Sequence, residues 1–270
     1  MQKISIALAT LTGVLLSALS AQAQTDQQLQ QLRSTKECRG CNLTNVNLAN
    51  TDLSNARLIN SSLFGSDFSG TRLTGANLSG IQAGELVVDA RSSDRRISNF
   101  TGADFSNADV SRASLSRAIL DRANFTNAYL LNTDFGSARL AGANFQGATL
   151  GTTFFGGADL TGVNMTNQRL VGVYLRNVNL ENAQLTGAQF DSSDLTNAVL
   201  KNADLRGARF VRTGISNVDF TGAKLDPETV TQLCQIASGN NTLVVARVDS
   251  RGVSTVTTSN VDSRQSLGCR

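Results

Sequence analysis

The sequence predicts an all-β fold in which the chain winds into a solenoid, and three features of a five-residue repeat predict it. An apolar residue recurs at every fifth position, 34 times in all, from Leu43 to Leu78 and again from Phe100 to Leu225. A small or β-branched residue stands two positions earlier in 33 of the 34 repeats. Asn or Asp often lies between the two. A repeat sustained over this length is typical of a stacked, quasi-one-dimensional architecture.

The period of five decides the kind of solenoid. It matches neither the 3.6-residue turn of an α-helix nor the two-residue period of a strand. The chain must therefore turn a corner in each repeat in order to place two of every five residues inside. Small inward residues let successive coils stack closely, and large ones fill the middle. We expect the coils to pair through backbone hydrogen bonds at the strand spacing of about 4.8 Å.

The repeat resembles the unit of a known family. Ala103-Asp104-Phe105-Ser106-Asn107 and Ala203-Asp204-Leu205-Arg206-Gly207 are similar to the A-(D/N)-L-x-x unit of pentapeptide-repeat proteins. The resemblance covers residues 41–225. It implies a right-handed quadrilateral β-helix with four repeats per coil, and it is to the coils of this β-helix that we assign residues 41–225.

The first residues resemble an export signal. Lys3 gives a basic start, Ile4 to Leu19 is an apolar run, and Ala21-Gln22-Ala23 is a small-x-small cleavage site. We therefore assign residues 1–23 to a signal peptide. The apolar run is shorter than the roughly 20 residues that span a bilayer, so we expect no membrane span after cleavage. Similar exported members of the family are abundant in cyanobacteria, which implies the periplasm or the thylakoid lumen.

Short helical caps are expected at both ends of the solenoid. Residues 24–40 form the first cap, with a helix over Thr25–Lys36 that begins at Thr25 and turns Leu29 and Leu32 inward. Residues 226–270 form the second cap. Its helix starts at Asp226-Pro227 and stops at Gly239, and a hairpin follows over 242–248 and 253–258.

The register of the repeat breaks once. From Leu78 to Phe100 is 22 residues, two out of phase with a period of five. Residues 84–96 are therefore predicted to leave the stack as a loop. It is either a tolerated surface insertion or a recognition loop, and its arginines Arg91, Arg95 and Arg96 are candidate contacts for a partner.

Four cysteines predict disulfides in an exported chain. We favour the pairs Cys38–Cys41 and Cys234–Cys269, because the members of each pair lie at the same end of a long stack. The CxxC spacing of Cys38 and Cys41 leaves thiol exchange open as an alternative. No thioredoxin-like pattern surrounds it, which favours a structural bond.

The composition argues against an enzyme and against a highly charged partner. The chain has no His, so it lacks the commonest general base and any Ser-His pair. No phosphate-binding loop, cofactor site or metal site is recognisable. Removal of Lys3 with the signal peptide leaves 23 basic and 21 acidic residues. This balance predicts no nucleic-acid partner.

Two departures from the pattern stand out. Gln168 is the one long polar residue at a small inward position, in a column otherwise filled by alanine. A buried amide needs hydrogen-bond partners, and we interpret it as a local bulge. Phe154 and Tyr174 stand just before central residues, where side chains point outward, and they are 20 residues apart. They either cover each other on adjacent coils or belong to a partner surface.

The sequence thus predicts a non-enzymatic, extracytoplasmic binding or structural scaffold with an unknown protein partner. Another branch of the resembling family, the DNA mimics that protect DNA gyrase, provides the first alternative. That role needs an acidic surface, and here the columns of outward residues are mixed in charge. A thiol–disulfide protein acting through Cys38 and Cys41 is the second alternative. The oligomeric state is not indicated.

Overall fold

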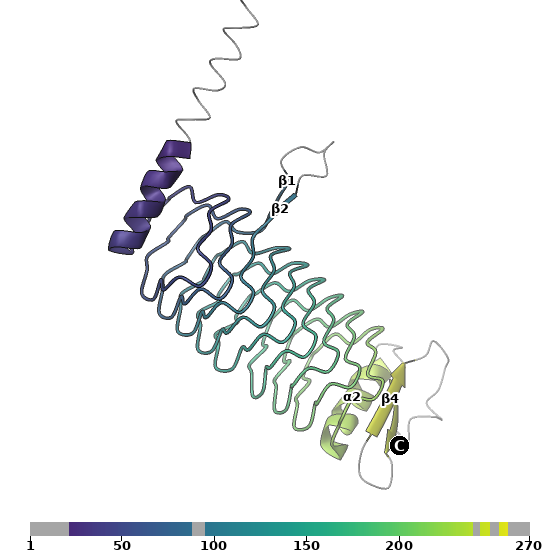
Figure 1. The fold of residues 1–270 in the computed structure, drawn as a ribbon. Coiled ribbons are helices and arrows are strands. Elements are labelled where there is room, and N and C mark those ends of the chain that lie inside the picture. Colours follow the sequence, from purple (N-terminus) through teal and green to yellow (C-terminus); the bar gives the residue numbers. More distant parts are fainter. Residues whose placement is uncertain (1–21, 88–94, 240–243, 249–253, 259–270) are drawn as a thin grey trace, which may run out of the picture.

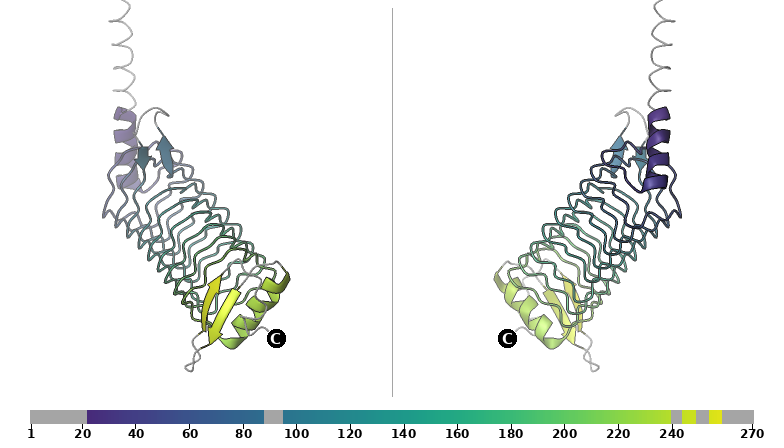
Figure 2. Two further views of the ribbon diagram at one scale, coloured as in Figure 1. Left: turned by 90° about the vertical axis from the view of Figure 1, so that its right-hand side faces the viewer. Right: turned by 90° about the vertical axis from the view of Figure 1, so that its left-hand side faces the viewer.

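A computed structural model describes residues 22–87, 95–239, 244–248 and 254–258. Most of them form an elongated stack of similar coils. A helix lies at the N-terminal end of the stack, and a helix and a two-stranded hairpin lie at the other end (Figures 1 and 2). The four described strands and the second helix are β1 (Glu85–Val87), β2 (Arg95–Ile97), α2 (Pro227–Gly239), β3 (Val244–Val248) and β4 (Ser254–Thr258).

The coils pair in parallel with a spacing of 20 residues. Asp104 bridges to Asn124, Asn124 to Asn144 and Asn144 to Asn164, and equivalent bridges follow on the other three faces. Each coil therefore contains four five-residue repeats. Backbone hydrogen bonds run along the stack on both sides of each bridge, as in Phe105 N–H to Asn124 O at 2.7 Å. The pairing is that of a parallel sheet reduced to one bridged residue per face.

The core is a continuous column of side chains inside the coils. From Leu43 to Leu225, the central residue of each repeat and the small residue two positions before it are buried, with the exception of the half-buried Thr51. Phenylalanines stack in register with the coils: the ring centroids of Phe105 and Phe125 are 4.8 Å apart, and so are those of Phe125 and Phe145. Phe135 and Phe155 form a second stack at 5.2 Å, edge-on to the first. These contacts make the stack a rigid support for its outer faces.

The backbone conformation at the corners explains which residue type stands two positions after each central residue. The second residue after the central one has a positive φ, for example Asn107 (57°) and Arg112 (58°). Asn tolerates this left-handed conformation better than other residues with a side chain, and Gly adopts it freely. At Gly70 (φ 62°) a Cβ atom would also lie 2.5 Å from Oδ1 of Asn50 in the preceding coil. The repeat therefore favours Asn or Gly at this corner position.

The interruption of the repeat is a hairpin that leaves the stack. β1 and β2 pair antiparallel, with Glu85 opposite Ile97, and the bridge spacing changes from 20 to 32 residues across them, as in Asp67–Asn99. The insertion therefore adds 12 residues. Ala83 is buried at the position of a central residue, so the coil continues one repeat beyond Leu78 before the chain departs.

At the N-terminal end, a helix over residues 22–35 packs against the first coil. Leu32 is fully buried in the common core, and Leu29 is partly buried against it. The prediction that this helix begins at Thr25 is wrong, because residues 22–24 are already helical and Thr25 is a buried position within the helix. The coils also start earlier than residue 41: Glu37 already bridges to Arg57.

At the other end, α2 packs on the last coil through Leu233, with Val230 and Ile236 beside it. Asp226 begins this helix. Its Oδ1 accepts a hydrogen bond from the Thr229 N–H at 2.8 Å, which satisfies one of the unpaired N–H groups of the first turn. β3 and β4 pair antiparallel beyond the helix, with Val244 opposite Thr258.

Candidate interaction surface

Exposed large apolar side chains gather along one corner of the stack. Besides Ile97 in the hairpin, the described residues of this kind are Tyr129, Leu131, Phe154, Val171 and Tyr174. We call these five residues the apolar edge. Phe154 bridges directly to Tyr174 in the next coil. Leu131 and Val171 lie on the corner next to that face, and Tyr129 lies on the face beyond it.

The two aromatic residues singled out by the sequence are the most prominent part of the edge. Phe154 is 44% exposed and Tyr174 is 52% exposed. Their ring centroids lie 6.1 Å apart at an interplanar angle of 45°, so they contact each other without burying each other. Half of their surface thus stays in water, which is unfavourable for a pair that serves stability alone.

Glycines fix how the side chains of the edge lie. A Cβ atom on Gly156 would lie 2.5 Å from Cζ of Phe154, and one on Gly136 would lie 3.0 Å from Cε1 of the same ring. Likewise, a Cβ atom on Gly151 would lie 3.0 Å from Cδ2 of Leu131. The Phe154 ring therefore rests on bare backbone, and the edge is both exposed and held in place.

Acidic residues border the aromatic pair above and below. Asp134 bridges to Phe154, and Asp194 bridges to Tyr174. Burial raises the pKa of Asp194, but hydrogen bonds from Thr196 and the charge of Arg176 outweigh it, so that the pKa is below its ordinary value. Arg176 approaches the carboxylate to 3.3 Å. The lowered pKa keeps Asp194 ionised at neutral pH, and the patch has an apolar centre with acidic residues on its rim, as interface patches often have.

The hairpin arginines are engaged at the base of the hairpin. The Arg95 and Arg117 guanidinium groups donate to the two carboxylate oxygens of Glu85 at 2.6 and 2.5 Å. These hydrogen bonds, that from Arg117 first, lower the pKa of Glu85, whose side chain is only 6% exposed. Arg96 packs closely over Gly65, because a Cβ atom on this glycine would lie 2.9 Å from the Cβ atom of Arg96.

The structure therefore does not bring Arg95 and the aromatic pair into one site. Arg95 pairs with Glu85, which is held by Arg117 beside Ser114, and two bridges, Ser114–Asp134 and Asp134–Phe154, separate that coil from Phe154. Arg91 lies outside the described residues. Tyr129, Leu131 and Val171 were not predicted as members of the edge, although aligning the sequence in 20-residue coils places them beside Phe154 and Tyr174.

Cys38 and Cys41 form a disulfide with a Cα–Cα distance of 5.5 Å. Both residues are buried, and Cys38 occupies the central position of the first coil. Burial at this point fits a bond that closes the start of the stack better than an exchange site, which needs an accessible sulfur. Cys234 is also disulfide-bonded, and Cys269 lies outside the described residues.

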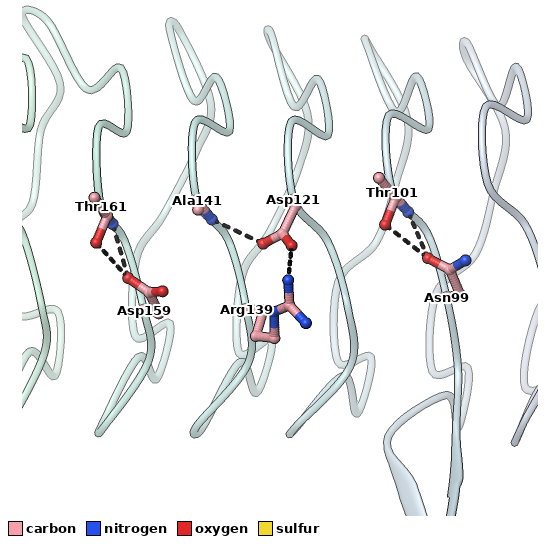
Figure 3. A network of polar contacts seen from close by, with 7 residues as sticks. All are labelled: Asn99, Thr101, Asp121, Arg139, Ala141, Asp159 and Thr161. Atoms are coloured by element: carbon pink, nitrogen blue, oxygen red, sulfur yellow. Dashed lines mark hydrogen bonds and ion pairs between the residues drawn. The ribbon is translucent and has the colours of Figure 1, made fainter.

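The carboxylates of the polar faces are used within the turns. Figure 3 shows Asn99 and Asp159 accepting hydrogen bonds through Oδ1 from the backbone and hydroxyl groups of Thr101 and Thr161. Between them, Asp121 accepts from the Ala141 N–H at 3.2 Å and pairs with Arg139 (Figure 3). In the described part of the chain, no three His, Cys, Asp or Glu residues cluster as metal ligands would.

Within the same described part, no helix has the length and apolar character required to cross a membrane.

Comparison with protein families gives one match. The model described as Pentapeptide repeats (8 copies) matches residues 41–80, 98–136, 118–157, 138–177, 158–197 and 188–226. These segments cover most of the coils and leave out the hairpin. A comparison with curated proteins finds no match.

Solved structures of the same kind resemble the chain. HetL, a pentapeptide-repeat protein involved in heterocyst differentiation regulation in the cyanobacterium Nostoc, is 26% identical over 72% of this chain and 90% of its own, with a TM-score of 0.41. The fluoroquinolone-resistance protein QnrB1 is 24% identical over 72% and 98%, with a TM-score of 0.36. A thylakoid-lumen protein of Arabidopsis thaliana is 26% identical over 38% and 72%, with a TM-score of 0.23. At these TM-scores none of the three carries an argument about function.

Proposed function

Because the chain belongs to the pentapeptide-repeat family, we propose that it is a non-enzymatic binding scaffold that acts outside the cytoplasm and engages a protein partner through the apolar edge. One observation carries the proposal: the exposed large apolar side chains of the coils gather on a single corner of a stack whose other outward positions are polar or half-buried. Patches of this kind mark interaction sites on soluble proteins.

The chemistry of the stack supports a binding role over catalysis. Proteins of this family are in general structural or binding proteins. In this chain most carboxylates along the coils are engaged by turn hydrogen bonds or by arginine, as at Asp159 and Glu85. A general acid or base must be free to exchange its proton with a substrate, and most of these carboxylates already have a partner in their own turn or in a neighbouring coil.

Two features support a place outside the cytoplasm, in the periplasm or the thylakoid lumen. The first 23 residues have the pattern of a signal peptide. The Cys38–Cys41 disulfide is of a kind that persists in oxidising compartments and is rare in the cytosol. In this setting we propose that the two terminal helices act as caps that keep the open ends of the stack from pairing with other chains.

The charge pattern speaks against the DNA-mimic alternative. A surface that replaces duplex phosphates has to be acidic along its length. The ladder column that contains Tyr129 also carries Asp109, Arg169 and Arg209, and it is bordered by the Arg209–Asp191 ion pair. The face that carries Tyr129 therefore has both positive and negative charges.

The experiment is partner capture with an edge variant and a matched control. The mature protein carrying Phe154→Ser and Tyr174→Ser is immobilised beside the wild type and beside Ile119→Ser with Val199→Ser, which removes outward apolar residues from another face. All three are exposed to the soluble exported fraction of the native cell. We expect a protein retained by the wild type and by the control to be lost from the edge variant. Retention of the same protein to an equal extent by the wild type, the edge variant and the control would refute the proposal.

A further inference from the structure

The ladder of bridges between coils is interrupted at one place. On the face of Tyr129, bridges run from Glu37 as far as Thr149 and resume between Arg169 and Gln189. Between residues 37 and 224 of the described chain, the bridge between Thr149 and Arg169 is the one missing from the four ladders. The neighbouring faces stay paired across the same two coils, at Asn144–Asn164 and Phe154–Tyr174. The opening is therefore confined to a single face.

Backbone hydrogen bonds are missing at the same place. Leu130 N–H donates to Thr149 O at 2.9 Å, and Leu170 N–H donates to Gln189 O at 2.7 Å. The equivalent N–H of Leu150, between them, has no such partner among the described residues. The N–H groups of Gly147, Thr152 and Arg169 likewise lack the cross-coil carbonyl that their counterparts in other described coils have.

Gln168 accounts for the opening. Its side chain is buried, and its Nε2 donates to the Ala148 carbonyl at 2.5 Å. In the other coils this carbonyl accepts from the backbone N–H of the residue after the small inward one, as Ala128 O accepts from Thr149 at 2.9 Å. The long side-chain amide of Gln168 thus bonds the acceptor that Arg169 N–H would use, and its buried side chain lies between the two coils whose ladder is open. The spacing between the coils stays at 20 residues, so no residue is inserted here. The predicted bulge is therefore replaced by a ladder that is open at one bridge.

Two backbone hydrogen bonds next to the opening are unusually long. Asn132 N–H reaches Gly151 O at 3.4 Å, and Tyr174 N–H reaches Thr153 O at 3.2 Å, whereas most ladder bonds are shorter. Gly151 and Val171, which face each other across the opening, belong to the corner that carries the apolar edge. A buried N–H without a protein acceptor is costly unless water satisfies it.

We propose that Gln168 holds open a hydrated seam between the coils of Thr149 and Arg169, and that this seam is the compliant point of an otherwise continuous ladder. Water pairs with the freed backbone groups, and the corner above the seam can open and close by small amounts. The inference goes beyond the proposed function, because the seam exists whether or not the edge binds a partner.

The test is residue-resolved amide hydrogen exchange, read by NMR, on the wild type and on Gln168→Ala. In the wild type, the amides of Leu150 and Arg169 should exchange at least about 100-fold faster than those of Leu130 and Gln189, which make the intact bonds one coil away. Alanine fills the same position in the coils on either side. In Gln168→Ala the ladder should close, slowing the two amides to within about tenfold of their neighbours and raising Tm by about 3–8 °C.

Gln184→Ala is the matched control, because Gln184 is an exposed glutamine on an intact ladder. It should change neither the exchange of Leu150 nor Tm by more than about 1 °C. Slow exchange of Leu150 and Arg169 in the wild type would overturn the proposal without any variant. A lower Tm of Gln168→Ala, or unchanged fast exchange in it, would overturn the role of the side chain.

Discussion

Truncation of Phe125 should be among the most damaging single changes in the coils. Its ring is fully buried and stacks at 4.8 Å on Phe105 below and on Phe145 above, while Phe135 meets it edge-on at 5.6 Å. Phe→Ala in a core costs about 3–5 kcal/mol. With two stacked neighbours held in place by the ladder, the cavity cannot collapse, so we expect about 4–5 kcal/mol.

Leu is the matched replacement for Phe125, because it is the commonest central residue of the repeat. Leu is smaller than Phe but leaves a much smaller cavity than Ala, so we expect Phe125→Leu to cost less than about 1.5 kcal/mol. At about 2–4 °C per kcal/mol, Phe125→Ala should lower Tm by about 8–20 °C, and Phe125→Leu by no more than about 6 °C. Thermal unfolding followed by far-UV circular dichroism measures both. A loss below about 4 °C for the alanine variant, or equal losses for the two, would refute the reasoning.

Acid should weaken the hairpin. Hydrogen bonds from Arg117 and Arg95 lower the pKa of Glu85 in the folded protein. The stabilisation that they provide is therefore present above the ordinary pKa of a glutamate and is lost as the pH falls through the lowered pKa. The protection of the amides of β1 and β2, measured as exchange rates relative to the intrinsic rate at each pH, should fall from pH 7 to pH 3 in the wild type and be low at every pH in Glu85→Gln. Asp226→Ala removes the cap on Thr229 and should cost about 0.5–2 kcal/mol in urea unfolding; no change would contradict the capping role. Intact-mass analysis after alkylation without reductant should find Cys38 and Cys41 unmodified, and a labelled thiol at either would contradict a structural bond.

The positions of the inward and outward residues could be predicted because the period alone fixes them. A 20-residue coil puts Phe154 and Tyr174 on one face one step apart, and the structure has them bridged and half-exposed. The same counting places Phe105, Phe125 and Phe145 in one buried stack. For these residues a side chain's environment depends only on its place in the repeat, so the sequence pattern is sufficient.

The ends of the repeat were harder to place, because the residues at central positions there are not the Leu or Phe by which the repeat is recognised. Ala83 fills a central site that the repeat otherwise gives to a large residue, and Cys38 fills the first one. Neither fits the apolar period as it is read from Leu and Phe. The start of the N-terminal helix was misplaced for a similar reason: Thr25 has the chemistry of a helix start, yet the helix already includes residue 22.

Contacts between coils could not be predicted, because a side chain can replace a backbone or turn partner 18 to 20 residues away. Arg139 stands where Asn99 and Asp159 accept from the backbone of their own turn, and it cannot accept (Figure 3). Asp121 of the preceding coil accepts from Ala141 instead and pairs with Arg139. Arg139 thus leaves its own turn without a side-chain acceptor, and Asp121 of the preceding coil supplies that acceptor instead.

Gln168 follows the same logic with the opposite result. Its amide also takes a partner from the preceding coil, the Ala148 carbonyl, but that acceptor belongs to the ladder itself. Where Asp121 supplies an acceptor that a turn lacked, Gln168 removes one that Arg169 N–H needed. The outward side chain of Asp121 therefore mends the stack, whereas the long inward side chain of Gln168 reaches an acceptor of the ladder itself. This competition explains why a single glutamine opens a ladder that alanine keeps closed in the neighbouring coils.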